Sequence, residues 1–335
     1  MLAFTLRRLL LAVPTLLVIS LVIFLLVDLA PGSPLSEIPL TVPPDVRQRM
    51  IAALGADQPV FVRYVLWLRQ FFWVEPATLF DSIFGTALAA DEQRILSWQA
   101  RSPVFTIIGQ RLPQTLTVIG TAYLVGILIA LPIGIYSAYR QYSWFDQAGT
   151  LFAMIGFSVP TFFSGTLFII IFAVWLGWFP TKYDTQLQVT DWASLLEQVR
   201  QMALPVMTLG LANAAVISRY MRSSMLDNLG ADYVRTARAK GLSERRVVLK
   251  HVLRNSLIPV VTVIALGIPS IFGGAIITEN LFGVNGIGAA LIGAIQASDI
   301  PMVQTLTFIF AVLIVLFNLI ADVLYGLLDP RIRYD

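Results

Sequence analysis

The sequence lacks cysteine altogether and contains a single histidine, His251, among its 335 residues. Without cysteine the chain can have no disulfide framework, no thiolate metal site and no cysteine nucleophile. One histidine cannot form a multi-histidine metal site, and the His-Glu-x-x-His pattern of zinc hydrolases is absent. We therefore expect no catalytic residue, no bound cofactor and no metal site, and an integral membrane enzyme fits this chain poorly.

Charged residues are also scarce. Lysine, arginine, aspartate and glutamate make up 13% of the chain and hydrophobic residues 57%, with a mean hydropathy of +0.77. A soluble domain carries roughly a quarter charged residues, because its surface must face water. The sequence contains no continuous basic face, so we expect no nucleic-acid partner. The composition predicts an all-α polytopic membrane protein, because a helix satisfies its own backbone hydrogen bonds in lipid.

Six hydrophobic runs are long enough to cross a bilayer, which takes about 20 helical residues. We interpret the first run as an uncleaved span, because it is longer than a signal-peptide core and no Ala-x-Ala site follows it. The third run exceeds the length of one span, so part of it should be loop or a tilted extension. The runs are Leu9 to Val27 and the segments between Arg111 and Arg140, Asp146 and Lys182, Arg200 and Arg219, Arg254 and Glu279, and Asp299 and Asp322.

The positions of lysine and arginine predict the orientation, because short cytoplasmic loops of membrane proteins are enriched in them. With the N-terminus inside, the only basic residues in the short outer loops are Lys182 and Arg200. Both termini should therefore be cytoplasmic. The basic residues on the predicted inner side are Arg7, Arg8, Arg140, Arg219, Arg222, Arg235, Arg238, Lys240, Arg245, Arg246, Lys250, Arg254, Arg331 and Arg333.

The segment 30–110 should form a region on the outer side. Its prolines end the first helix. Farther on, apolar residues recur at helical spacing and predict an interfacial or docked helix. Two interpretations stay open, an outer cap with structural aromatic residues and a docking surface for a soluble partner. The prolines are Pro31, Pro34, Pro39, Pro43 and Pro44, and the apolar residues are Phe61, Val65, Leu68 and Phe72.

The segment 223–255 should project into the cytoplasm as two helices. The sequence places an apolar stripe on the first helix, a terminating glycine at Gly241 and a capping residue for the second helix at Ser243. A basic stripe on the second helix could face anionic lipid. Alternatively, the two helices form a rigid knob that transmits force from another protein to the helix bundle. The apolar stripe is Leu226, Leu229, Tyr233 and Ala237, and the basic stripe is Arg246, Lys250 and Arg254.

Here the sequence resembles the membrane subunits of binding-protein-dependent ABC importers, and within them one of two permease types, the B type, of the dipeptide/oligopeptide/nickel family. Residues 232–242 read DYVRTARAKGL and residues 251–255 read HVLRN. They fit that type's loop, D-Y-(I/V)-R-T-A-R-A-K-G-L followed by H-x-L-R-N. Of the broader EAA-loop motif, only Ala237, Gly241 and Leu253 match. The resemblance extends to the start (RRLLLAVPTLL, APGSP), to Glu279, Phe282, Gly286 and Gly288, and to the ending DPRIR.

The resemblance implies a type I permease core. Residues 1–29 would hold the N-terminus and first span, and 111–335 the other five spans with the coupling loop 223–255. Implied partners are a second, similar permease, two ABC ATPase subunits and an external solute-binding protein, within membrane lipids. The chain has no G-x-x-x-x-G-K-(S/T) loop, so ATP and Mg would be used by those ATPases and this subunit would not be an enzyme. The implied coupling residues are Asp232, Tyr233, Arg235, Thr236, Ala237, Arg238, Lys240, Gly241, Leu242, His251, Leu253 and Arg254.

Four of the polar residues inside the predicted spans are candidates for the translocation pathway, namely Ser158, Thr161, Asn213 and Asn318. Polar groups at such depth usually face the bundle interior, and hydrogen bonding between helices is the alternative role for each. Among cargoes, peptides are favoured, while nickel chelates, glutathione and oligosaccharides stay open. A self-contained secondary transporter would place ionisable residues inside spans and show inverted repeats, and the sequence shows neither.

Overall fold

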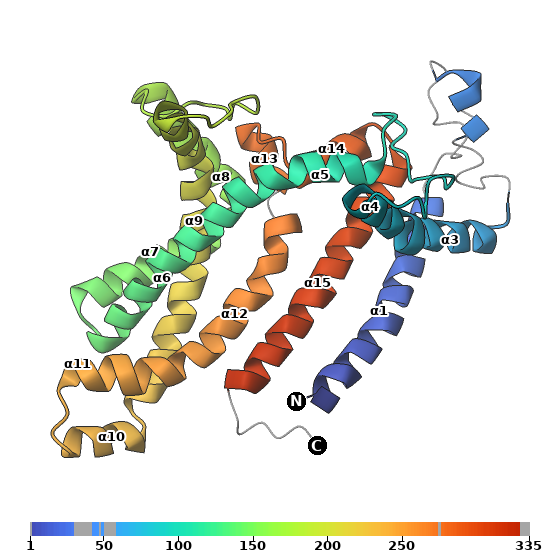
Figure 1. Cartoon of the computed structure of the whole chain (residues 1–335). Helices are drawn as coiled ribbons and strands as arrows, with labels where there is room; N and C mark the ends of the chain where they lie inside the picture. Colours follow the sequence, from blue (N-terminus) through green and yellow to red (C-terminus); the bar gives the residue numbers. More distant parts are fainter. Residues whose placement is uncertain (1, 30–41, 47, 50–57, 274–275, 329–335) are drawn as a thin grey trace. The chain divides into compact units, whose positions relative to one another are not determined.

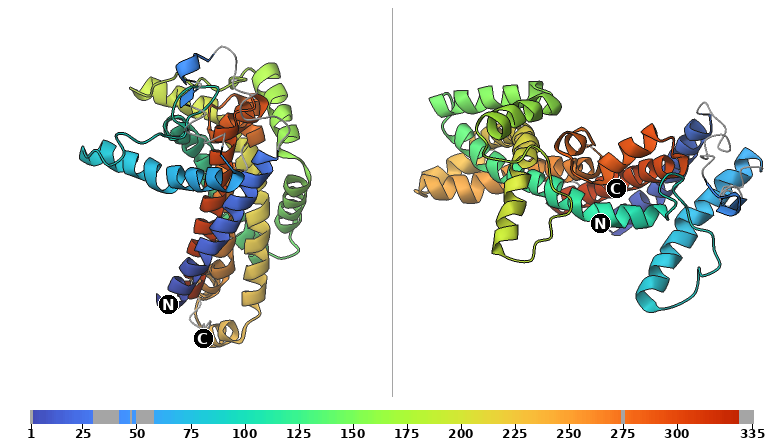
Figure 2. Two further views of the ribbon diagram at one scale, coloured as in Figure 1. Left: turned by 90° about the vertical axis from the view of Figure 1, so that its right-hand side faces the viewer. Right: turned by 90° about the horizontal axis from the view of Figure 1, so that it is seen from above.

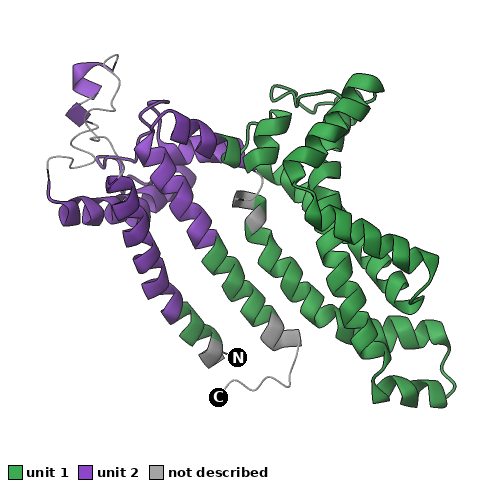
Figure 3. Ribbon diagram, turned by 180° about the vertical axis from the view of Figure 1, so that it is seen from behind, with its two compact units in different colours: residues 1–9, 114–289, 314–335 green, residues 10–113, 290–313 purple. Residues whose placement is uncertain are grey.

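The computed structural model describes residues 2–29, 42–46, 48–49, 58–273 and 276–328 (Figures 1 and 2). These residues are mostly helical, and their only bridge between extended segments joins Leu96 and Pro103. Pro31, Pro34, Pro39 and the ending DPRIR lie outside the described residues. The chain divides into two compact units, residues 1–9, 114–289 and 314–335, and residues 10–113 and 290–313 (Figure 3).

The helices follow one another in this order, with η marking π-helical turns. The first half contains α1 (Leu2–Asp28), α3 (Val60–Arg69), η1 (Gln70–Val74), α4 (Glu75–Phe84), α5 (Val104–Thr115), η2 (Leu116–Gly120), α6 (Thr121–Tyr139), α7 (Trp144–Ser158), α8 (Thr161–Phe168) and η3 (Ile169–Trp175). The second half contains α9 (Trp192–Leu229), α10 (Asp232–Ala239), α11 (Glu244–Arg246), η4 (Val247–Val252), α12 (Leu253–Gly273), α13 (Ile276–Phe282), α14 (Ile287–Gln296) and α15 (Ile300–Leu328).

Five helical segments are long and apolar enough to cross a membrane. They agree with the predicted first, second, fourth, fifth and sixth spans. Two bent helix pairs also pass the length and hydropathy criteria, so the number of spans by these criteria is five, or up to seven. The count of six therefore stays a prediction. The five segments are Thr5–Asp28, Val104–Tyr139, Trp192–Leu229, Glu244–Pro269 and Ile300–Leu324.

Part of the long third run is loop, as expected, since residues 176–182 are not helical, and the sequence did not predict that the rest divides into separate helices. Helix α7 ends at Ser158, α8 starts at Thr161, and the two are bent by 105°. Pro160 causes the break, because it has no N–H to donate and it disfavours helical geometry in the preceding residue. Accordingly, Val159 has extended dihedral angles, φ −85° and ψ 122°.

The bundle of the first unit is built around α6 and α9, which pack along much of their length. Buried alanines lie on both helices, among them Ala130 and Ala138 on α6 and Ala214 on α9. Small side chains at a helix contact allow the two backbones to approach closely, which is how helices associate within lipid. Helix α12 joins the same core through Val260, which is fully buried.

In the second unit, α3 forms as the apolar spacing predicted, but its buried face is a different one. Tyr64, Trp67 and Phe71 are buried, whereas the predicted stripe residues Phe61 and Phe72 are exposed. The helix therefore has two apolar faces, one packed on this unit and one uncovered by it.

Candidate functional site

The candidate coupling loop begins where the long helix α9 stops. Helix α9 ends at Leu229, a turn follows at Gly230 and Ala231, and α10 starts at Asp232. The backbone N–H of Ala231 donates to the carbonyl of Asn228 at 3.2 Å. The prediction of a single helix through Leu226 and Ala237 is therefore wrong. Because the turn separates α9 from α10, residues before and after it do not share one helical face. As a result Val234, not Tyr233, is the buried residue beside Ala237.

Gly241 ends α10 in the conformation that the sequence predicted. Its φ is +75°, a left-handed value that residues with a Cβ rarely adopt. The Gly241 N–H donates to the Arg238 carbonyl at 2.9 Å, and the Leu242 N–H donates to the Ala237 carbonyl at 3.3 Å. This pair of bonds is the Schellman motif, which satisfies the last carbonyls of a helix and reverses the chain direction.

The second helix of the loop starts after Ser243 and differs in detail from the prediction. Ser243 occupies the N-cap with extended geometry, but its side chain makes no capping hydrogen bond. Residues 247–252 then form the π-helical turn η4. A π turn bonds each residue to the fifth along the chain, so the four-residue spacing of Arg246, Lys250 and Arg254 does not follow one α-helical face. All three arginine and lysine side chains are exposed.

An ion pair closes the loop. Arg238 on α10 donates to Glu244 at the start of α11, from Nη2 to Oε1 at 2.7 Å and from Nε to Oε2 at 3.2 Å. These hydrogen bonds to the carboxylate raise the pKa of Arg238 above its ordinary value. Both side chains are about two-fifths exposed, so the pair contributes at most about 1 kcal/mol and sets geometry more than stability.

Buried valines anchor the loop to the helix bundle. Val234, Val247 and Val252 are fully buried in one apolar cluster that includes Met221 and Met225 of α9. Two buried serines also tie α9 to α12, because Ser224 Oγ donates to the Ser256 carbonyl at 2.8 Å and Ser256 Oγ to the Ser224 carbonyl at 3.2 Å. Residues of α10, η4, α9 and α12 therefore share one apolar core.

The predicted coupling residues fall into an exposed set and an anchoring set. Tyr233 donates from its hydroxyl to Asn228 Oδ1 at 2.6 Å, and the Thr236 hydroxyl donates to the Asp232 carbonyl at 3.0 Å. The exposed residues are Asp232, Tyr233, Arg235, Thr236, Arg238, Lys240, Gly241 and Arg254. The buried or half-buried residues are Ala237, Leu242, His251 and Leu253.

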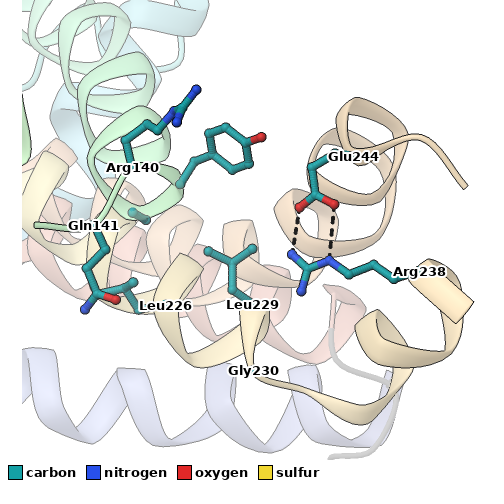
Figure 4. A pocket seen from close by; sticks show the side chains of 9 residues that line it. Arg140, Gln141, Leu226, Leu229, Gly230, Arg238 and Glu244 are labelled. Atoms are coloured by element: carbon teal, nitrogen blue, oxygen red, sulfur yellow. Dashed lines mark hydrogen bonds and ion pairs between the residues drawn. The ribbon is translucent and has the colours of Figure 1, made fainter. Parts of the chain in front are cut away.

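A pocket of about 520 Å³ lies beside the loop (Figure 4). Leu226, Leu229 and Gly230 at the end of α9 line it, together with Arg140 after α6 and the pair of Arg238 and Glu244. Apolar and cationic groups from several elements thus border one hollow.

Near this loop, the sequence-based reasoning missed a buried ion pair between α7 and α9. Arg222 donates to both carboxylate oxygens of Asp146, at 2.5 and 2.8 Å, and the Asp146 side chain is 4% exposed. The carboxylate also accepts from the Tyr142 N–H at 2.9 Å. Asp146 and Arg222 lie 76 residues apart in the sequence, so no local spacing rule predicts that they form an ion pair.

The four pathway candidates are not brought together by a hydrogen-bond network. Ser158 and Asn318 are exposed, and Thr161 and Asn213 are half-buried. Within the part of the chain that the structure describes, none of the four side chains bonds to another helix. Gly156 and Gly165 are close-packing positions, because a Cβ there would meet Ala215 of α9 and Leu281 of α13 at 2.6 and 2.7 Å.

A second buried carboxylate organises the turn between α13 and α14. Glu279 is 1% exposed and accepts from the Thr115 hydroxyl at 2.7 Å and the Ala289 N–H at 2.9 Å. Thr115 Oγ1 in turn accepts from the Ile287 N–H at 2.8 Å. Gly286 lies against this pair, and a Cβ there would overlap the Glu279 carboxylate and the Thr115 hydroxyl. Any side chain at position 286 would therefore collide with Glu279 and Thr115, so glycine is required there.

Comparison with known proteins adds the family. Residues 130–334 match the family described as "Binding-protein-dependent transport system inner membrane component", and residues 1–119 match the N-terminal part of such membrane components. The oligopeptide transport system permease protein AppB of Bacillus subtilis is 37% identical over 338 residues, covering 100% of both chains. The glutathione transport system permease protein GsiC of Salmonella choleraesuis has the same identity and coverage. A putative peptide permease protein of Brucella suis is 36% identical and covers 99% of each chain.

Proposed function

Because the chain belongs to the family of binding-protein-dependent transport system inner membrane components, we propose that it couples ATP hydrolysis by partner subunits to transport through a channel it helps to form. The family identifies it as a multi-pass inner-membrane subunit of a bacterial ABC importer. It would supply half of the channel, and a second, similar permease the other half. ATP and Mg would be used by two ATPase subunits, and this chain would have no ATPase site of its own.

The rigid loop of residues 232–253 is the observation that supports coupling most. The exposed face of α10 carries Arg235 and Lys240, while Val234 and Ala237 on its other face are buried in the bundle core. A force applied to the exposed face is transmitted to α9 and α12, because the buried face packs at the density of a protein core and deforms little. Closure of the ATPase dimer would in this way change the tilt of those helices.

The distribution of charge supports the proposed orientation. We place both termini and the loop 223–255 in the cytoplasm, with six spans and the region 30–110 outside. The segment from Arg219 to Arg254 is basic, and cytoplasmic loops are enriched in lysine and arginine. An external solute-binding protein would deliver cargo from the other side.

Peptides are the proposed cargo. The relatives named for oligopeptide and peptide transport are as similar to this chain as the one named for glutathione, itself a short peptide. Ser158, Thr161, Asn213 and Asn318 are proposed to line the pathway with the second permease, since the exposed Ser158 and Asn318 are available for contacts with another chain.

Co-purification and cross-linking test this function. The tagged chain, extracted gently from its native membranes, should bring down a second permease and P-loop ATPases, and the eluate should hydrolyse ATP. Since the chain has no cysteine, the Arg235→Cys variant contains a single reactive thiol, which should cross-link to an ATPase subunit. The control is Gln188→Cys, an exposed position just before the start of α9, which should not cross-link to an ATPase subunit. Recovery of the chain alone, from a preparation in which a known ABC complex survives, would contradict the proposal.

A further inference from the structure

Helices α3 and α4 and the π turn between them carry an apolar surface that no described residue of their unit covers. Phe61 is 74% exposed, Phe72 is 50% exposed and Ile83 is 65% exposed. The other exposed apolar side chains of this surface are Val65, Trp73, Leu79, Phe80 and Phe84. A contiguous patch of this size on a soluble surface is rare and marks a protein or membrane contact.

The opposite face of the same segment is firmly packed. The rings of Trp67 and Phe71 lie 5.2 and 4.8 Å from the ring of Phe308, centroid to centroid. Phe24 of α1 lies edge-on to Tyr64 at 5.4 Å. Aromatic packing of this kind fixes the position of a helix. The uncovered face is therefore held in one orientation.

The segment is attached where the first span ends. Arg63 pairs with Asp28, the last residue of α1, at 2.6 Å, and the Tyr64 hydroxyl lies 2.7 Å from Ser20 Oγ. Figures 1 and 2 show α3 running across the end of α1 rather than along it. Leu26 of α1 and Leu29 directly after it are apolar and exposed, 65% and 78%, at the same end. The segment is thus attached to an end of the first span that exposes apolar side chains.

The charged side chains of Arg69, Glu75 and Asp81 bond to residues 88–94 of the loop that follows α4. Arg69 pairs with Glu92, and the buried Glu75 accepts from Arg94 at one oxygen, Oε2, from Nη2 at 2.6 Å and from Nε at 3.2 Å. Asp81 accepts from the N–H groups of Leu88 and Ala89 at 2.9 and 2.8 Å. The residues 88–94 that engage these charges are distinct from the exposed apolar residues. Arg69 is the exposed cation of this face, with its side chain 55% exposed, and its charge is paired with Glu92.

We propose that α3, η1 and α4 lie in the membrane interface, with the face formed by Phe61, Phe72 and Ile83 inserted among lipid chains. The partner is a lipid surface, because the segment adjoins the end of a spanning helix and presents aromatic rings, with its exposed cation Arg69 paired to Glu92. Helices of this type insert their apolar face about 5–10 Å into the boundary between headgroups and acyl chains, and Trp73 suits that boundary. The segment then braces the first span against tilting. This inference rests on membrane insertion alone and not on coupling to ATP.

Fluorescence quenching of single-cysteine variants tests the lipid contact. The full chain, in its purified complex and reconstituted into liposomes, is labelled at Phe61→Cys, Phe72→Cys or Ile83→Cys with an environment-sensitive fluorophore. Leu26→Cys on α1 serves as the lipid reference and Ala87→Cys in the loop after α4 as the water reference, since both positions are exposed. Quenching is measured with nitroxide placed high on the acyl chains and with aqueous iodide.

The three labels should be quenched by the lipid nitroxide to within about twofold of the Leu26 reference, and by iodide far less than the Ala87 reference. Strong iodide quenching would overturn the proposal by placing the face in water. Protection from both quenchers would also overturn it, because a protein partner would then cover the face. All three positions are exposed, so the substitutions remove little packing, and an unchanged melting temperature confirms that each variant is folded.

Discussion

At the scale of single residues, Gly241 offers a sharp test of coupling. Its φ is +75°, and an added Cβ would meet no atom within 4 Å, so a substitution strains the backbone without a steric clash. Gly241→Val should cost about 1–2 kcal/mol in the turn and lower ATP-driven uptake about fivefold or more, at unchanged membrane levels. Transport into proteoliposomes, measured per ATP hydrolysed, checks this.

Gly85 supplies the matched control for that variant. It also terminates a helix, α4, with φ +70° and open space around a Cβ. Gly85→Val should introduce the same local strain but leave the coupling of ATP hydrolysis to uptake unchanged. If both variants reduced coupling equally, the effect would be one of general stability and the role of Gly241 would be lost.

The ion pair of Asp146 and Arg222 should matter for stability. The Asp146→Ala variant leaves the Arg222 guanidinium without its carboxylate partner. We expect the free energy of unfolding to fall by about 2–3 kcal/mol, less than for a fully buried pair because Arg222 is partly exposed. Asp232→Ala removes the carboxylate from an exposed pair with Arg235 and should change stability by less than about 0.5 kcal/mol. Thermal unfolding in detergent compares the two. Equal melting temperatures would show that the buried pair is energetically neutral.

At the scale of the elements, the sequence predicted the parts of the loop that depend on local rules. The terminating role of Gly241 follows from backbone sterics, because its φ is +75°. The break at Gly230 was missed, and with it the burial of Val234 in place of Tyr233. A helix break shifts every later residue to another face, and where a helix stops is decided by packing that a single sequence does not display.

The turn between α13 and α14 provides an element-scale prediction. Gly286→Ala forces a methyl group into the space held by Glu279 and Thr115, and we expect a loss of about 1–3 kcal/mol. Gly293→Ala lies in the middle of α14 with nothing within 4 Å of the new methyl, so helix propensity should stabilise it by up to about 1 kcal/mol. Opposite shifts of the melting temperature are the expected result. A destabilising effect of both variants would argue against the steric account.

At the scale of the whole molecule, the sequence predicted membrane insertion and five of the spans, because those depend on hydropathy and length. It did not predict contacts between distant segments. Asp299, for example, accepts hydrogen bonds from Ser97 and the Trp98 N–H, residues about 200 positions earlier, while also receiving the Met302 N–H at the start of α15. Nothing in local composition connects such groups, so the burial of Asp299 and Glu279 emerged only from the structure.

Helix α9 allows a test of which side of the membrane each part of the chain occupies. Its 38 residues reach about 57 Å at the usual helical rise, which exceeds the roughly 30 Å thickness of the hydrocarbon core. Its two ends should therefore lie on opposite sides of the membrane. Because the basic segment follows its C-terminal end, a membrane-impermeant maleimide should label Ala239→Cys only after the inner membrane is permeabilised, and Gln188→Cys in intact spheroplasts. The reversed pattern would place the loop 232–253 outside the cytoplasm, where no ATPase subunit could reach it, and the proposed coupling would fail with the orientation.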